Sequence, residues 1–292
     1  VATRRLAVDL PSGVDVVQAD LTDLHQCRSA ARGMDCVFHL AAVGGGLHAN
    51  MKAQHEMFTA NVLVNTNMLE ASYREGVERY LLTSSSAVYD GDAGVLDDGQ
   101  PWRSDPHPSE FGFGWAKRVA EIQARTYADA CGMRIAIVRP SNPYGPRDNF
   151  DPEQSHVIPA LIRRVQAGER PLSVWGTGKA IRSFIYVGDV ADAMLLALEH
   201  DAVCDPVNIA SGEQTSIADL ARLILALCGV DPSMIEFDAT KPEGHPGKFP
   251  KITKARDRIS FVAQTSLRDG LEKTIRWLRE TQRVPSGSQK SR

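Results

Sequence analysis

The chain lacks the sequence patterns of a metal site and of a disulfide framework. Its five cysteines are scattered, with no Cys-x-x-Cys pair and no histidine-rich stretch beside them. Metal sites and disulfide-stapled folds both show cysteines or histidines at characteristic spacings. We therefore expect no metal and no disulfide, and the free thiols favour a reducing cytoplasm. The cysteines are Cys27, Cys36, Cys131, Cys204 and Cys228.

Long apolar runs and a strong charge of one sign are also missing. No run approaches the roughly 18 apolar residues of a membrane-spanning helix, and the N-terminus has no signal-peptide pattern. The net charge of −3 is too small to attract nucleic acid. With 292 residues and 43% hydrophobic content, the chain can bury one large core or two adjoining ones. We expect a globular protein that binds neither nucleic acid nor a membrane.

What the chain does contain is an alternation of strand and helix patterns. Short β-branched runs are separated by longer segments with helical spacing, which predicts βαβ units and a parallel sheet. Several runs are apolar on both faces, as strands covered by helices on both sides should be. The expected strands are 14–18, 36–40, 80–83, 134–139 and 183–187, and the expected helices are 57–74, 116–130 and 157–167.

Two later helices have clear start signals. Ser216 is followed three residues later by Asp219, and Ser266 by Asp269, which is the spacing of a helix N-cap. Gly229 stands where a C-terminal cap would end the first of these helices. We therefore expect a helical C-terminal portion.

The stretch Phe-Gly-Trp-Ala-Lys at 113–117 resembles the Tyr-x-x-x-Lys catalytic signature of short-chain dehydrogenases/reductases. In that chemistry a lysine ammonium lowers the pKa of a phenol, which passes a proton to or from a sugar hydroxyl. Phe113 occupies the tyrosine position and has no proton to pass. Lys117, on the same helical face, can still hydrogen-bond the nicotinamide ribose. The alternative is a core phenylalanine and a surface lysine.

A serine-rich segment at 83–89 fits the same chemistry. By resemblance Ser85 is the catalytic hydroxyl, which holds the reacting sugar oxygen. Dehydratases of this kind carry an Asp-Glu pair at the next two positions, where this chain has Ser86 and Ala87. Elimination of water is therefore not expected. The alternative is a plain serine-rich loop.

Two earlier segments resemble the cofactor side of the same family. Asp20 and Leu21 follow a strand, where a carboxylate can accept a hydrogen bond from adenine while an apolar side chain packs on its ring. Ala41 and Ala42 follow the next strand, where small residues let a dinucleotide approach. The alternatives are a helix cap at Asp20 and a tight turn with packing alanines.

The block 139–159 is the most specific stretch, and it resembles the GDP-fucose synthase subfamily. That resemblance makes His156 a candidate acid/base and Asn142 a substrate-binding residue. The subfamily's cysteine partner is replaced by Ala87. A histidine near a helix start can alternatively be a cap or a solvated residue.

Further on, two cationic residues fall in the substrate-side pattern of the family. The guanidinium of Arg182 suits a diphosphate, which it can grip with two parallel hydrogen bonds. Lys248 lies where relatives often place a phosphate-binding arginine and can act as a point charge. The alternatives are a surface arginine and a solvated loop lysine.

Together these segments identify the chain as resembling the extended short-chain dehydrogenases/reductases, in the NAD-dependent epimerase/dehydratase family. This implies an α/β fold with a Rossmann-like doubly wound parallel sheet and a smaller C-terminal substrate-binding domain. Residues 1–142, with 181–202 returning to them, would bind the dinucleotide, and 143–284 would mainly bind substrate. The tail 285–292 is expected to be disordered. The implied cofactor is NAD or NADP, the implied partner a nucleotide sugar, and the implied assembly a homodimer.

The sequence also lacks the glycine-rich turn with which a dinucleotide-binding fold begins. The only glycine before Asp20 is Gly13. We therefore expect the first βα unit to be missing, because the chain is a fragment, its start is misassigned or the protein lacks that unit. Such a chain is expected to bind NAD and NADP weakly or not at all, and to fold poorly alone.

Three functions remain open from the sequence. The first is a nucleotide-sugar epimerase or reductase whose activity Phe113 reduces. The second is a catalytically inactive homologue that keeps the sugar-nucleotide pocket. The third is a reductase of small carbonyl compounds, which Arg182 and the long C-terminal portion disfavour, since a small substrate needs no diphosphate grip.

Overall fold

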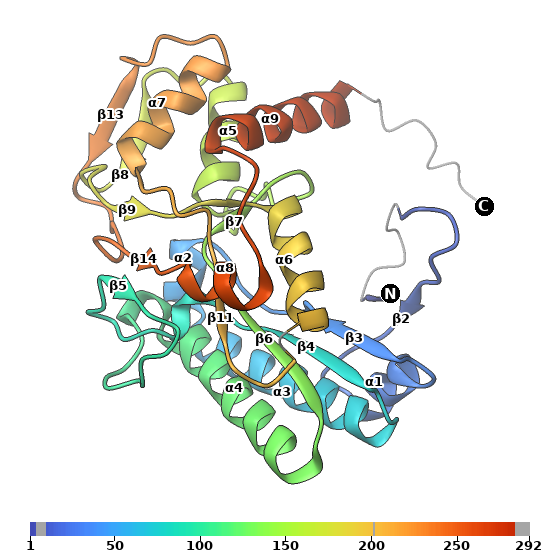
Figure 1. The fold of residues 1–292 in the computed structure, drawn as a ribbon. Coiled ribbons are helices and arrows are strands. Elements are labelled where there is room, and N and C mark those ends of the chain that lie inside the picture. Colours follow the sequence, from blue (N-terminus) through green and yellow to red (C-terminus); the bar gives the residue numbers. More distant parts are fainter. Residues whose placement is uncertain (4–9, 201, 284–292) are drawn as a thin grey trace.

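The computed structural model describes residues 1–3, 10–200 and 202–283 (Figure 1). At its centre lies a four-stranded parallel sheet with the order β11-β6-β4-β3. The strands are β3 (Cys36–His39), β4 (Arg79–Thr83), β6 (Arg134–Pro140) and β11 (Val207–Ile209). Leu82 pairs with both His39 and Ile137, so three strands end together at one edge of the sheet.

Helices bury both faces of this sheet, because successive side chains of a strand point to opposite faces. Leu81 and Val138 pack against α6 and α8 on one face, whereas Tyr80 and Ile137 pack against α3 and α4 on the other. Figure 1 shows α6 and the α3–α4 pair on opposite sides of the strands. The helices are α3 (Gln54–Arg74), α4 (Phe111–Cys131), α6 (Val187–His200) and α8 (Thr253–Ile259).

The N-terminal part adds a separate parallel pair and one helix. These are β1 (Ala2–Thr3), β2 (Val17–Gln18) and α1 (Leu24–Ala31). The Asp23 side chain accepts the N–H of His25 at 2.8 Å and caps α1. Cys27 of α1 packs near Met68 of α3, which attaches this part to the helical layer. Among the described strands, β3 pairs with β4 alone.

The C-terminal portion builds a second core from three amphipathic helices and a parallel strand pair. These are α5 (Val157–Gln166), α7 (Ile217–Leu227), α9 (Leu267–Arg283), β8 (Leu172–Trp175) and β13 (Ile235–Asp238). Ile162, Ile224 and Leu271, one from each helix, are fully buried together. This core lies at the top of Figure 1, above the carboxyl ends of the central strands.

Short strand pairs join segments that lie far apart in the sequence. They are β5 (Val95–Leu96) with β14 (Phe249–Pro250), β7 (Pro143–Tyr144) with β10 (Ile185–Tyr186), and β9 (Ile181–Arg182) with β12 (Thr215–Ser216). A short helix, α2 (Leu47–Lys52), and two 3-10 turns, η1 (Ser86–Val88) and η2 (Pro108–Glu110), complete the connections.

The predicted fold class is confirmed, with differences in extent. The predicted caps are present: Ser216 Oγ accepts the Asp219 N–H at 3.0 Å, and Ser266 Oγ accepts the Asp269 N–H at 3.1 Å. The predicted strand 183–187 is only two residues long, because α6 begins at Val187. The helix predicted at 116–130 begins five residues earlier, which places the whole 113–117 motif on α4. The predicted disordered tail, 285–292, lies outside the described residues.

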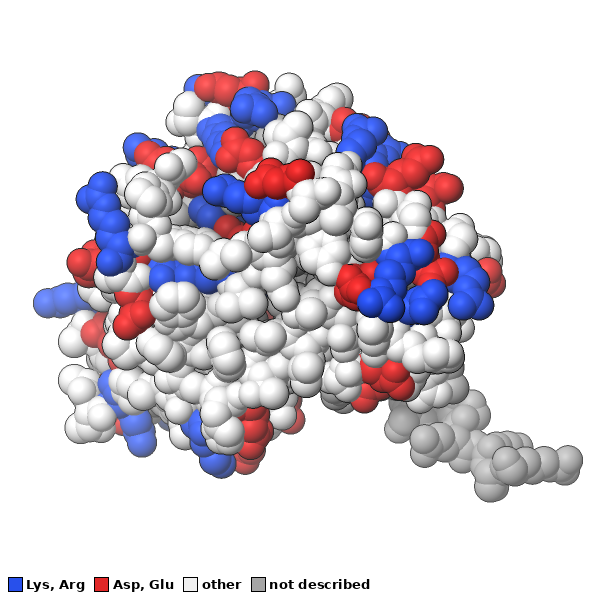
Figure 2. Space-filling view, turned by 90° about the horizontal axis from the view of Figure 1, so that it is seen from below, with Lys and Arg blue, Asp and Glu red and all other residues white. Residues whose placement is uncertain are grey.

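Charges of both signs are interspersed on the face seen in Figure 2. Lysines and arginines alternate with acidic residues around its rim, and no large field of one sign covers it. This pattern agrees with the net charge of −3. Within the described residues, no helix is both long enough and apolar enough to cross a membrane.

Candidate functional site

A glycine turn at 44–46 follows β3, at the carboxyl edge of the sheet. A Cβ on Gly46 would lie 2.2 Å from the carbonyl oxygen of Ser155, and Gly46 N–H donates to Gln154 O at 2.8 Å. Only a residue without a side chain permits this approach. Buried Asn61 of α3 holds the residue before the turn: its Oδ1 accepts from Val43 N at 3.0 Å, and its Nδ2 donates to Val43 O at 2.6 Å. Sequence reasoning had not singled out Asn61.

Phe113 and Lys117 lie on one face of α4, as their spacing predicts. Lys117 Nζ lies 5.7 Å from the centroid of the Phe113 ring and donates to the Thr83 carbonyl oxygen at 2.7 Å. A Cβ on Gly44 would lie 3.6 Å from the same ring. Lys117 is only 2% exposed, so the alternative of a surface lysine is wrong. Phe113 is half-buried between Lys117 and the glycine turn.

The surroundings of Lys117 lower the pKa of its ammonium group. Burial lowers the pKa of Lys117 to about 8, although the carboxylate of Glu121, one turn further along α4, acts in the opposite direction. Burial, and then the charge of Lys117, lower the pKa of His39 to about 3. The His39 Nε2 lies 2.9 Å from Asn65 Oδ1. An ammonium that can lose its proton near neutral pH therefore stands near a neutral imidazole.

Ser85 lies in the loop that follows β4 and begins η1. Its Oγ accepts the Ala87 N–H at 3.1 Å, which leaves the hydroxyl proton available to another acceptor. A Cβ on Gly114 would lie 2.5 Å from the Ala87 carbonyl oxygen, so α4 lies directly against this loop. Thr83, the last residue of β4 before this loop, accepts from Lys117 through its carbonyl oxygen. The structure thus brings the Ser85 loop, Phe113 and Lys117 together.

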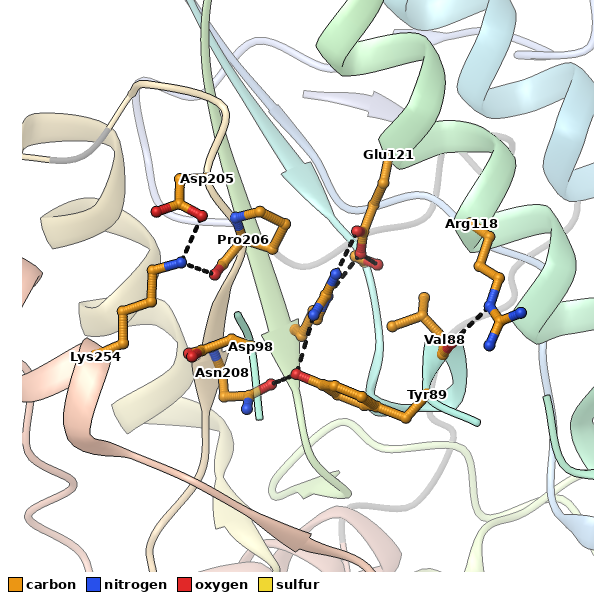
Figure 3. Close-up of polar contacts among 11 residues, drawn as sticks. Val88, Tyr89, Asp98, Arg118, Glu121, Asp205, Pro206, Asn208 and Lys254 are labelled. Carbon is orange, nitrogen blue, oxygen red and sulfur yellow. Dashed lines mark hydrogen bonds and ion pairs between the residues drawn. The ribbon is translucent and has the colours of Figure 1, made fainter. Parts of the chain in front are cut away.

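A buried polar network, here called the Glu121 network, fixes this loop. The Ser84 hydroxyl donates to Glu121 Oε1, and Glu121 accepts from Arg139 Nε at 2.9 Å and from Nη2 at 2.6 Å. Arg139 Nη1 donates to the Tyr89 hydroxyl at 3.0 Å, and that hydroxyl donates to Asn208 Oδ1 at 2.6 Å. Figure 3 shows Glu121, Tyr89 and Asn208 along this path. A fully bonded buried network holds its members in one arrangement.

His156 lies at the start of α5 with its side chain exposed. Its side chain makes no capping hydrogen bond, so the alternative of a side-chain cap is wrong. The preceding residue, Ser155, is the one that faces Gly46. The backbone at His156 therefore lies beside the glycine turn. Ala87, in the partner position, is buried and apolar.

Asn142 bonds the residue that follows Arg182, so these two candidate substrate-binding residues lie in adjoining segments. Asn142 adopts a left-handed conformation (φ 44°), which asparagine tolerates better than most residues. Its Nδ2 donates to the Ser183 carbonyl oxygen at 3.0 Å. Half-buried Arg182 donates from Nη1 to Ile181 O at 2.9 Å. No described carboxylate lies within ion-pairing distance of its guanidinium.

Lys248 is not a solvated loop lysine, since only 7% of it is exposed. Its Nζ forms an ion pair with Glu110 Oε2, on the residue just before α4. Burial raises the pKa of Glu110, but the charges of Lys248 and Arg182 outweigh that effect and hold it below its usual value. Glu110, which the sequence had not suggested, thus neutralises Lys248.

Asp20 and Leu21 form a turn after β2. Asp20 Oδ1 accepts from Thr22 N at 3.0 Å and from Thr22 Oγ1 at 2.8 Å, so Asp20 is not the cap of α1. Leu21 is half-buried against the core that contains Cys27. A shallow pocket opens here, lined by Gln18, Ala19, Asp20 and Gln26.

The sequence of this chain matches a known family profile. The profile of the NAD dependent epimerase/dehydratase family covers residues 1–210. The chain belongs to this family. The resemblance inferred from the motifs is therefore confirmed.

Characterised relatives are sugar reductases and GDP-fucose synthases by name. The chain is 32% identical over 271 residues to dTDP-4-dehydro-6-deoxy-D-allose reductase of Streptomyces bikiniensis, covering 91% of this chain and 82% of the relative. It is 34% identical over 242 residues to GDP-L-fucose synthase 1 of Arabidopsis thaliana, covering 81% and 74%.

Solved structures share the fold across most of the chain. UDP-glucose 4-epimerase of Thermotoga maritima, solved with UDP-glucose, superposes with a TM-score of 0.84 at 22% identity, covering 96% of this chain and 90% of that one. MoeE5, solved with UDP-glucose and NAD, gives 0.79 at 28% identity over the same shares. At 22% identity, the Thermotoga structure supports the fold alone.

The family is NAD(P)-dependent. The candidate places for the two ends of such a cofactor are the pocket beside Asp20, after β2, and buried Lys117, on the face of α4 that carries Phe113. Ala41 is half-buried and Ala42 exposed just beyond β3, where small side chains leave room. Within residues 1–3, 10–200 and 202–283, no glycine-rich turn leads from a first strand into a helix, so no pyrophosphate contact is assigned.

Proposed function

We propose that the chain is an NAD(P)-dependent nucleotide-sugar epimerase or reductase. When bound, the nicotinamide supplies hydride transfer at a sugar carbon. One observation carries the proposal: the Ser85 loop, Phe113, Lys117 and the Ser155–His156 segment meet around one glycine turn at the carboxyl edge of the sheet. Open α/β sheets bind ligands at this edge.

In this proposal each residue has one task. Ser85 orients the reacting sugar oxygen with its hydroxyl proton, and Lys117 supplies positive charge to the ribose and to the reacting centre. Phe113 can pack against the sugar but cannot transfer a proton. General acid–base catalysis typically contributes about 10²–10⁴-fold, so this factor is reduced in the chain as it stands. His156 is the remaining candidate for proton transfer.

The binding residues follow the same division. Asp20, Leu21, Ala41, Ala42 and Lys117 would contact NAD or NADP. On the substrate side Arg182 would grip the diphosphate, with Asn142 holding the neighbouring strand in place through Ser183. Lys248 would contribute less than a free lysine, because Glu110 already neutralises it.

The substrate class rests on the relatives. Their names specify dTDP- and GDP-linked sugars, and MoeE5 was solved with UDP-glucose and NAD. We propose a nucleotide sugar for this chain, bound between the central sheet and the C-terminal core. By the same proposal, residues 1–142 with 181–202 serve the cofactor, and 143–284 mainly serve the substrate.

Phe113 supports a second candidate, a catalytically inactive homologue that binds nucleotide sugars. Its ring fills the position between Lys117 and the glycine turn without an oxygen. A binding protein needs the diphosphate grip and the stacking surfaces but no phenol.

Two measurements on the purified chain separate these candidates. Calorimetric titration with UDP-, GDP- and dTDP-sugars tests binding, and consumption of NADH or NADPH with 4-keto nucleotide sugars tests turnover. Binding with turnover supports the enzyme, and binding without turnover supports the homologue. Absence of binding to any nucleotide sugar contradicts both.

We further propose a cytoplasmic homodimer formed through α3 and α4. Large apolar side chains on these helices are exposed, namely Phe58, Leu63 and Ile122. The five unpaired cysteines support a reducing location. Light scattering after gel filtration should give twice the chain mass of 31.9 kDa, and a monomer would contradict the dimer.

A further inference from the structure

The Ser85 loop is held at both of its ends by one buried ion pair. Ser84, just before Ser85, donates to Glu121. Tyr89, just after the η1 turn, accepts from Arg139 Nη1 at 3.0 Å through its hydroxyl. Glu121 and Arg139 are bonded to each other through two hydrogen bonds. The ion pair therefore fixes the distance between the two ends of the loop.

Arg118 of α4 adds a second hold on the far end of the loop. Its Nε donates to the Val88 carbonyl oxygen at 2.7 Å, and its Nη1 donates to the Ser104 carbonyl oxygen at 2.7 Å. The guanidinium carbon lies 4.9 Å from the centroid of the Trp102 ring, and Arg118 is only 1% exposed. The orientation of Ser85 thus depends on buried side chains on either side of it.

Tyr89 also bonds to Asn208, on the other side of the network in Figure 3. The Tyr89 hydroxyl donates to Asn208 Oδ1 at 2.6 Å. Burial raises the pKa of Tyr89 to about 12, against the charge of Arg139, so the phenol keeps the proton that makes this bond. Asn208 is fully buried in β11. A single hydroxyl therefore connects the end of the Ser85 loop to β11.

Asn208 in turn bonds both strands of the β5–β14 pair. Its Nδ2 donates to the Leu96 carbonyl oxygen at 2.9 Å and to the Lys251 carbonyl oxygen at 3.3 Å. Lys248, the candidate phosphate contact, directly precedes β14. The segment that carries Lys248 and the loop that carries Ser85 are therefore joined through one buried amide.

We propose that Tyr89 and Asn208 are positioning residues, which transmit the placement of the β5–β14 pair to Ser85. A fully bonded buried network holds its members in one arrangement, and a misplacement of about 1 Å at a reacting group can cost about 10²-fold in rate. The inference rests on the proposed function, in which Ser85 orients the reacting sugar oxygen. It adds that the placement of the segment after Lys248 and the orientation of the serine are coupled.

The first measurement needs no turnover and follows amide hydrogen exchange by mass spectrometry. The N–H groups of Ala87 and Val88 are hydrogen-bonded within the Ser85 loop, so their exchange reports its opening. Tyr89→Phe removes one oxygen from the path and keeps the ring. Tyr144→Phe is the matched control, because Tyr144 is 3% exposed against 4% for Tyr89 and donates to the Leu267 carbonyl oxygen at 3.2 Å. Exchange in β6 reports global opening.

We expect Tyr89→Phe to raise the exchange rate of residues 84–88 at least about tenfold, because a hydrogen bond to a buried guanidinium is lost. Exchange in β6 should rise much less, since the change opens the loop and not the sheet. Tyr144→Phe should leave the exchange of residues 84–88 as in the native chain.

A double variant tests whether the two residues act along one path. Asn208→Ala should raise exchange at 84–88 and also at 94–98 and 249–251, which its amide holds directly. Tyr89→Phe/Asn208→Ala should exceed the larger single effect at 84–88 by less than about twofold, since either change already interrupts the path.

The second measurement separates positioning from a purely structural role. It compares kcat and KM of the chain carrying Phe113→Tyr with and without Tyr89→Phe. A misplaced serine affects the chemical step, so kcat should fall about 10–100-fold while KM stays within about threefold. Adding Tyr144→Phe in place of Tyr89→Phe should change neither constant.

Four results would overturn the inference. They are exchange at 84–88 that Tyr89→Phe does not raise, an equal rise in β6, effects of Tyr89→Phe and Asn208→Ala that multiply in full, and an unchanged kcat. If the chain carrying Phe113→Tyr turns over no nucleotide sugar, the proposed function fails, and the exchange measurements alone decide this inference.

Discussion

Removing the carboxylate at the centre of the Glu121 network should destabilise the protein strongly. The side chains of Glu121 and Arg139 are only 5% and 4% exposed, and the carboxylate accepts three hydrogen bonds. Glu121→Ala leaves the Arg139 guanidinium buried without its counter-charge. Breaking a buried pair on one side typically costs about 3–5 kcal/mol, and we expect a loss of that size in the free energy of unfolding.

The assay is urea unfolding followed by circular dichroism at pH 7, with an exposed pair as the matched control. Arg268 and Glu272 lie 3.8 Å apart on α9 with side chains 59% and 45% exposed. Glu272→Ala should cost no more than about 0.5 kcal/mol, because solvent screens such pairs. The double variant Glu121→Ala/Arg139→Met should lose less than the sum of its single changes, since it leaves no unpaired charge. A loss below about 1 kcal/mol for Glu121→Ala would refute the reasoning.

Three further changes test other parts of the site by the free energy of unfolding. Folding lowers the pKa of Lys117 from 10.5 to about 8, so the native chain gains stability as pH rises through this window. The stability of Lys117→Met relative to the native chain should therefore fall by about 3 kcal/mol from pH 8 to 10.5. A difference that stays constant with pH would contradict this. Folding lowers the pKa of His39 from 6.5 to about 3, so the native chain loses stability as pH falls below 6.5. His39→Gln should lose about 2 kcal/mol less between pH 6.5 and 4.5. Equal acid sensitivity of the two chains would argue against a buried neutral imidazole. Gly46→Ala should lower the free energy of unfolding by about 1–3 kcal/mol, because its Cβ would meet the backbone of Ser155. Gly94→Ala is the control and should be tolerated, since Gly94 has open space around it. Equal effects of the two changes would show that the glycine turn is not closely packed.

The sequence predicted the parts of the fold that depend on local pattern. The cap at Ser216 and three of the four central strands, β3, β4 and β6, follow from spacing and β-branched runs, and the structure places them as expected. The fourth, β11, was not predicted. The strand expected at 183–187 was wrong in extent, because its apolar side chains serve β10 and the first turn of α6 equally well. A short apolar run alone does not distinguish a strand from the first turn of a helix.

The sequence predicts site residues that belong to a motif. It does not predict charged residues that come together from distant parts of the chain. Lys117 and Ser85 were proposed because their spacing matches a known chemistry, and the structure places their segments side by side. Glu110 and Lys248 are 138 positions apart in the sequence, so no local pattern predicts that they form an ion pair. Asn61 could have been noticed as an amide within the apolar stripe of a helix, and such buried polar residues need a partner.

The most direct test of the central claim is the rate of Phe113→Tyr. That claim is that this chain holds a sugar-nucleotide site with one altered position, between Lys117 and the glycine turn. The rate of NADH or NADPH oxidation with a 4-keto nucleotide sugar is compared among the native chain, Phe113→Tyr, and Phe113→Tyr/Lys117→Ala. We predict that the tyrosine raises the rate by about 10²–10⁴-fold and that the gain requires Lys117. A native chain that already turns over at an ordinary rate, or a tyrosine variant no faster than it, would contradict the account.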